Sequence, residues 1–148
     1  MIYFLTSSRQ SPETRMPLSA KTRTLLFLVV TAGYWLVIFG GTHTPGNPFP
    51  GGGHRDKLAH FGAFAGLAFL LCGSVACFRP MRPAYYGAIL GLVACYGIID
   101  ELTQLLVSRT ADPLDWVADM SGAIFGMVIF AVGLRFFRPR EGRHGATG

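Results

Sequence analysis

Charged residues are scarce in this sequence. Only 14% of its 148 residues are Asp, Glu, Lys or Arg, whereas about 25% is usual for soluble domains. Hydrophobic residues make up 51% and fall in long blocks rather than in alternation. The shortage of charge therefore argues against an ordinary water-soluble domain and predicts an integral membrane protein.

Cysteine and the familiar chemical motifs are also sparse. Cys72, Cys77 and Cys95 are odd in number and lie in apolar stretches, which argues against a disulfide framework. There is no His-Glu-x-x-His, no Cys pair at ligand spacing and no phosphate loop ending in Lys-Ser/Thr. The sequence thus identifies no cofactor and no metal, and the expectation is that the chain uses no cofactor. The net charge of +5 comes from clusters flanking apolar blocks, so nucleic acid is not an expected partner.

Four apolar stretches are long enough, or nearly so, to cross about 30 Å of hydrocarbon. They cover residues 24–39, 58–78, 84–107 and 116–137, of which the first is the shortest. The sequence therefore predicts an all-α fold, a polytopic four-helix transmembrane bundle, with 24–137 as its membrane domain. Residues 1–23 are expected to form a cytoplasmic tail, 138–148 a basic tail, and the Gly/Pro-rich segment 40–55 an irregular extracytoplasmic connection.

The start of the chain carries a separate prediction. Met16 is followed by Lys21, Arg23 and the first span, a conventional beginning for a membrane protein. We therefore expect Met16 to be the initiator; native protein whose N-terminus lies upstream of it would contradict this.

Basic residues predict the orientation, because Lys and Arg collect in cytoplasmic flanks. Ten of the 13 lie on one side: Arg9, Arg15, Lys21, Arg23, Arg79, Arg82, Arg135, Arg138, Arg140 and Arg143. The other side has Arg55, Lys57 and Arg109. Both termini are therefore expected to be cytoplasmic.

Acidic residues follow the opposite distribution. Six of the eight map to the outer half: Asp56, Asp100, Glu101, Asp112, Asp115 and Asp119. With His60, they bring polar groups of three helices to a similar depth. The pairs Asp56/His60, Asp100/Gln104 and Asp115/Asp119 are four residues apart and share helix faces. Because a charge at the centre of a span costs about 2.5 to 3.5 kcal/mol, at least one of Asp100 and Glu101 must face the bundle interior, a cation or water.

Structural roles compete with functional ones at several of these positions. Asp112 before Pro113 is typical of an N-cap, and Asp115 would then be favoured by the helix dipole. Asp56-Lys57 fits an interfacial anchor pair as well as a functional group, and His60 alone fits a hydrogen-bonded histidine of the bundle. Arg109 could neutralise carboxylates or hold an anionic substrate.

Glycines at four-residue spacing predict close helix packing in lipid. The spacing occurs once in each of the last three spans, at Gly62 and Gly66, Gly87 and Gly91, and Gly122 and Gly126. Three such pairs favour a tight bundle.

The polar residues together resemble the VanZ-like family of small bacterial membrane proteins. The resemblance rests on Asp56-Lys57-x-x-His60-Phe61, on Asp100-Glu101-x-x-Gln104, and on Arg109-x-x-Asp112-x-x-Asp115-x-x-x-Asp119-x-x-Gly122. These motifs occur in the family's order and cover residues 56–126. At Asp119 the chain departs from the asparagine often found in the family.

The resemblance implies a multi-pass protein of the bacterial inner (plasma) membrane, in a family named for low-level resistance to the glycopeptide teicoplanin. Three functions remain open. The polar pocket between spans 2–4 could bind an envelope lipid, glycolipid or lipophilic glycopeptide at the outer face, as in cell-envelope protection or antibiotic resistance. It could instead belong to a membrane enzyme with a His/Asp/Glu acid–base or metal site, or to a proton or ion relay. The lipid bilayer is the expected partner, and a homo-oligomer is compatible with the sequence.

Overall fold

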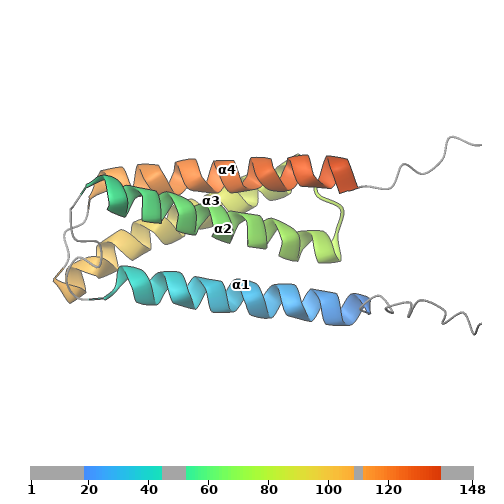
Figure 1. Ribbon diagram of the computed structural model, residues 1–148, viewed down its shortest axis with the longest axis horizontal. Helices are drawn as coiled ribbons and strands as arrows, with labels where there is room; N and C mark the ends of the chain where they lie inside the picture. The colour runs from blue at the N-terminus through green and yellow to red at the C-terminus, as the bar shows by residue number, and fades with distance from the viewer. Residues whose placement is uncertain (1–18, 45–52, 109–111, 138–148) are drawn as a thin grey trace, which may run out of the picture.

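The computed structural model describes residues 19–44, 53–108 and 112–137, and all of their regular elements are helical (Figure 1). The helices are α1 (Ala20–Thr42), α2 (His54–Phe78), α3 (Pro83–Gln104), the short 3-10 helix η1 (Leu105–Val107) and α4 (Pro113–Phe137). Four helices are long and apolar enough to cross a membrane. The predicted all-α, four-span fold is therefore confirmed.

The first helix is longer than its apolar core suggests. Where the sequence predicts a shortest span at 24–39, α1 has 23 residues and α3 has 22. At its start the Ser19 side chain accepts a hydrogen bond from the Thr22 N–H, and at its end the Thr42 hydroxyl bonds back to the Ile38 carbonyl. α1 thus includes residues 40–42, which the sequence analysis assigns to the irregular 40–55 connection. Met16, residues 45–52, Arg109 and the tail 138–148 lie outside the described residues.

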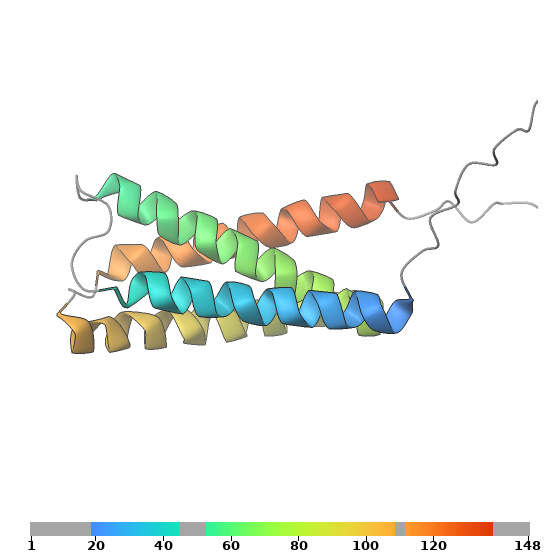
Figure 2. The same ribbon diagram turned by 60° about the horizontal axis from the view of Figure 1, so that its bottom comes forward.

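The four helices run up and down, so that the start of α1 and the end of α4 lie at the same end of the bundle (Figure 1). At the opposite end the last turns of α1 and α3 meet the first turns of α2 and α4, as Figure 2 also shows. α2 makes its most extensive contacts with α4, while α1 packs mainly against α2. This arrangement brings polar residues from distant parts of the sequence to one end.

The glycines of α4 allow the closest approach between helices. A Cβ added at Gly122 would lie 2.8 Å from the carbonyl carbon of Phe61, and one at Gly126 would lie 2.8 Å from that of Ala65. These are backbone atoms of α2, so side-chain rotation could not relieve the overlap. Because glycine has no side chain, the backbones of α2 and α4 can approach each other closely here.

The other four glycines differ from this pair. A Cβ at Gly62, Gly87 or Gly91 would have nothing within 4 Å, so these three glycines are not at a close helix contact within the chain. Gly66 faces the ring of Tyr34 rather than another backbone. The four-residue spacing places two glycines on one face, but it does not say whether that face meets a neighbour.

Candidate functional site

A buried polar contact joins α2 to α4. Nδ1 of His60 lies 2.9 Å from Oδ1 of Asp119, and the two residues are only 4% and 1% exposed. Because an ionised carboxylate can only accept, this contact assigns the hydrogen to Nδ1. Among the described residues nothing bonds the other ring nitrogen, Nε2, whose ring borders a cavity.

Lys57, in the first turn of α2, joins this helix to the start of α4. Nζ of Lys57 lies 2.6 Å from Oδ2 of Asp112 and 2.8 Å from Oδ1 of Asp115. Asp115 is buried, one turn above Asp119, and one ligand atom from each of Asp56, His60 and Asp115 lies within 4.8 Å of the other two. The polar faces that the i, i+4 spacings predict on α2 and α4 therefore lie next to each other.

Asp112 has the capping role expected for it. Its Oδ1 accepts a hydrogen bond of 2.9 Å from the Leu114 N–H at the start of α4. The Lys57 ammonium, together with that N–H, holds the pKa of the Asp112 carboxyl below its ordinary value. The Asp112 N–H in turn donates to Oε2 of Glu101 at 2.9 Å, which ties the end of α3 to the start of α4.

Asp100 forms a separate group between α1 and α3. Its carboxylate accepts hydrogen bonds from the hydroxyls of Thr42 (2.9 Å) and Tyr96 (3.3 Å) and from the amide of Gln104 (3.1 Å). Nδ1 of His43 lies 3.8 Å away. Asp100 is thus surrounded mainly by neutral donors.

Three of these partners were not among the residues selected from the sequence. Tyr96 stands four residues before Asp100, and the spacing argument that joined Asp100 to Gln104 could have found it. Thr42 and His43 could not be identified from the sequence, because the Gly/Pro content of segment 40–55 predicts an irregular connection. The site therefore takes polar groups from all four helices, whereas the sequence indicated three. Arg109 lies outside the described residues, so its place in the site stays a prediction.

Two buried carboxylate oxygens in this region lack a partner. Oδ2 of Asp119 and Oε1 of Glu101 have no hydrogen bond in the part of the chain that the structure describes. An unpaired polar atom in a buried setting costs about 1–3 kcal/mol, and more when it is charged. The site therefore has spare acceptor capacity, which can hold a proton, a hydrogen-bond donor or a cation.

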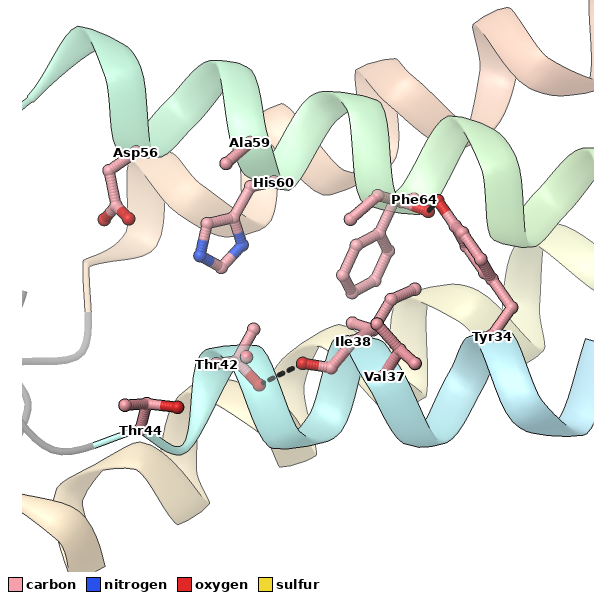
Figure 3. Close-up of a pocket in the computed structure, with 11 residues that line it drawn as sticks. Tyr34, Val37, Ile38, Thr42, Thr44, Asp56, Ala59, His60 and Phe64 are labelled. Carbon is pink, nitrogen blue, oxygen red and sulfur yellow. Dashed lines mark hydrogen bonds between the residues drawn. The ribbon is translucent and has the colours of Figure 1, made fainter. Parts of the chain in front are cut away.

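An open cavity of about 290 Å³ reaches the site from between α1 and α2. Figure 3 shows Asp56 and His60 on α2 facing Thr42 on α1 at one end, and Val37, Ile38 and Phe64 at the other. This cavity lies between α1 and α2, whereas the sequence predicts a polar pocket between spans 2–4, which stays a prediction. The space between α2 and α4 is closed by the glycine contacts and by the His60–Asp119 and Lys57 pairs.

Acidic side chains outnumber basic ones among the described residues of the site. Six carboxylates gather here, on Asp56, Asp100, Glu101, Asp112, Asp115 and Asp119, and the lysine that contacts them is Lys57. Cations and hydrogen-bond donors are therefore the ligands that the polar end of the cavity favours.

A family model described as VanZ/LLP1 matches residues 1–136 of the chain. No curated protein and no solved structure gives a significant match. The match includes all of the polar residues described above and nearly the whole bundle. It confirms the resemblance found in the sequence motifs: the chain belongs to the VanZ/LLP1 family.

Proposed function

We propose that this VanZ/LLP1 protein binds the head of a membrane amphiphile and thereby acts in protection of the bacterial cell envelope. The observation that supports this most is the two-sided cavity between α1 and α2. Its polar end carries Asp56 and His60, and its apolar end carries Val37, Ile38 and Phe64. A ligand that fits both ends has a polar head joined to an apolar chain.

The size of the cavity limits what it encloses. About 290 Å³ is at the lower end of the range of about 300 to 1,000 Å³ found for small-molecule pockets. The cavity can hold a headgroup and the first part of a chain, while the rest of the chain stays among the lipids. Apolar residues with high exposure, such as Leu36 (72%) and Val29 (60%), line the outside of α1 and suit that lipid contact.

Orientation gives the site its proposed location. Positive flanks favour the cytoplasm, so the end of the bundle that holds the start of α1 and the end of α4 would be cytoplasmic and the acidic end outward. The ligands available there include envelope lipids, glycolipids and lipophilic glycopeptides of the teicoplanin type. Sequestering or shielding such a molecule would produce a resistance phenotype.

A cavity-filling substitution tests this proposal. Ala59 lines the cavity on α2, and Ala59→Leu would occupy part of it, whereas Ala88→Leu adds the same side chain at an exposed position of α3. We expect Ala59→Leu, in purified protein in lipid nanodiscs, to weaken binding of dodecylamine at least about tenfold, equivalent to about 1.4 kcal/mol. Ala88→Leu should bind as the wild type does.

The cellular part of the test uses a deletion strain complemented with the same two variants. Teicoplanin susceptibility and the membrane lipid profile should return to wild-type values with Ala88→Leu and not with Ala59→Leu. Equal binding and equal complementation by both variants would contradict the proposal.

The His60–Asp119 pair favours a second function, catalysis on a lipid-linked substrate. A histidine oriented by a carboxylate through Nδ1, with Nε2 next to a cavity, has the arrangement of a general base. If this function holds, His60→Gln abolishes turnover of the substrate while amphiphile binding in the cavity persists. Loss of both together would favour simple binding.

A further inference from the structure

The acidic end of the cavity also has the geometry of a metal site. We propose that Asp56, His60 and Asp115 bind one divalent first-row transition ion, Mn²⁺ or Zn²⁺. The ion would lie between the first turns of α2 and α4, beside the amphiphile cavity. Its binding requires no amphiphile, so the two proposals can fail separately.

The distances between the groups are close to those of a bound ion. The three potential ligand atoms lie within 4.8 Å of one another. Three atoms that bind one Zn²⁺ tetrahedrally at about 2.0–2.2 Å lie about 3.3–3.6 Å apart. The three ligand atoms would therefore have to approach one another by at most about 1.5 Å, and rotation of the half-buried Asp56 side chain can contribute to that movement.

The orientation of His60 is an independent observation. Metal-binding histidines usually donate their second ring N–H to a carboxylate, which fixes the ring and its tautomer. Nδ1 of His60 is held by Asp119 at 2.9 Å, which leaves the Nε2 lone pair of a 4% exposed ring beside the cavity. A gathering of acidic residues at helix ends would not by itself require this buried, half-satisfied imidazole.

The electrostatics of the cluster also favour a cation. Lys57 contacts Oδ1 of Asp115, which leaves Oδ2 of that carboxylate for an ion. Glu101 and Asp119 each retain an unpaired buried oxygen nearby. Removing carboxylates from water without a counter-charge costs several kcal/mol each, and a divalent ion would offset that cost for several of them at once.

The ligand types select the class of ion. Imidazole suits Zn²⁺ and its neighbours, whereas carboxylates alone suit Mg²⁺, Ca²⁺ and Mn²⁺. One histidine with two aspartates lies between these groups and fits Mn²⁺ or Zn²⁺. Three protein ligands leave a coordination position open, as in catalytic zinc sites, and the cavity borders it.

Metal binding can be tested on the full chain in nanodiscs after treatment with a chelator. Mn²⁺ or Zn²⁺ is added and retained metal is measured by mass spectrometry after desalting. We expect one ion per chain in the wild type. Asp56→Asn should weaken binding at least about tenfold, and Asp119→Asn about 10- to 100-fold, because Asp119 positions His60 without touching the ion.

Asp112→Asn is the matched control, because it removes a carboxylate that pairs with Lys57 but is not in the triad. It should retain the ion. Pulsed electron paramagnetic resonance of bound Mn²⁺ should show coupling to an imidazole nitrogen in the wild type and lose it in His60→Gln.

Three results would overturn the cation site: no stoichiometric ion in the wild type, equal losses in Asp112→Asn and Asp56→Asn, or no imidazole coupling in wild-type protein. If His60→Gln does not fold, Asp56→Asn still decides, because Asp56 is half-buried in the first turn of α2. Dodecylamine binding by metal-free protein would leave the amphiphile proposal intact while the cation site fails.

Discussion

The glycine contacts between α2 and α4 predict that a single methyl group disturbs both the bundle and the site. In Gly122→Ala the new Cβ would lie 2.8 Å from the Phe61 carbonyl carbon, whereas ordinary contacts begin at 3.4 Å. The Phe61 carbonyl oxygen would be closer still, so the helices would have to part by at least about 0.6 Å, and a gap of that size forfeits roughly a quarter to a half of each affected contact. Overpacking of this kind typically costs about 1–3 kcal/mol.

The same displacement reaches the polar site, because Phe61 adjoins His60 and Gly122 follows Asp119 by one turn. A parting of at least about 0.6 Å would lengthen the 2.9 Å His60–Asp119 contact to about 3.5 Å or more, beyond the usual range of such hydrogen bonds. Gly122→Ala is therefore expected to lower both the free energy of unfolding and the affinity of any ligand that needs an oriented His60.

Two glycine controls separate this effect from a general loss of glycine flexibility. Gly62→Ala and Gly87→Ala add the same methyl group to α2 and α3 where nothing lies within 4 Å. Thermal unfolding in detergent, with tryptophan fluorescence as the signal, should show a clear loss for Gly122→Ala and none for the controls. If Gly122→Ala unfolded at the same temperature as the wild type, the assignment of α2–α4 as the closest helix contact would be refuted.

Three further predictions concern single polar groups. Asp100→Leu removes the acceptor of the Tyr96 hydroxyl and the Gln104 amide and should destabilise the protein in thermal unfolding by about 1–3 kcal/mol for each, whereas Asp100→Asn keeps an acceptor and should cost less. Ser74→Ala removes the 2.9 Å contact with Thr31 that joins α1 to α2; since Thr31 keeps its bond to the Phe27 carbonyl, the loss in detergent unfolding should be about 0.6 kcal/mol and not above about 1.7. The lowered pKa of Asp112 means that its stabilising effect is complete above the ordinary value of 3.8 and is lost as the pH falls through the lower, folded-state value. The difference in melting temperature between wild type and Asp112→Asn should therefore be the same at pH 7 and pH 5 and shrink only below 3.8; a decline already between pH 7 and 5 would show that another group controls it.

The fold could be predicted from the sequence because each membrane-spanning helix has to meet the requirements of the lipid environment by itself. Each span must satisfy its own backbone and present apolar side chains, so composition alone reveals the four helices. The clustering of polar groups was also predictable, since i, i+4 spacing and a shared depth apply before any packing is known. The shared depth put His60 with Asp119, and Lys57 with Asp115, in one cluster, but it did not specify these pairs.

What the sequence could not supply was the direction each face takes. Gly87-x-x-x-Gly91 and Gly122-x-x-x-Gly126 are alike as patterns, yet only the second meets another backbone closely. The choice depends on the rotation of each helix about its axis, which the whole bundle determines. Thr42 was missed for a related reason: its glycine-rich surroundings are typical of a loop, but its own hydroxyl bonds to α1 carbonyls within a helix that continues to it.

The packing of the helices separates the polar site into two parts with different constraints. α2 and α4 are joined by backbone contacts and hold His60, Asp115 and Asp119 in place. α1 has two buried residues against seven in α2, yet it forms one wall of the cavity and donates from Thr42 to Asp100. A ligand of the proposed kind that entered between α1 and α2 would leave the glycine contacts between α2 and α4 closed. Such entry would require no break in the His60–Asp119 pair, so the orientation of His60 would be kept while the ligand exchanged.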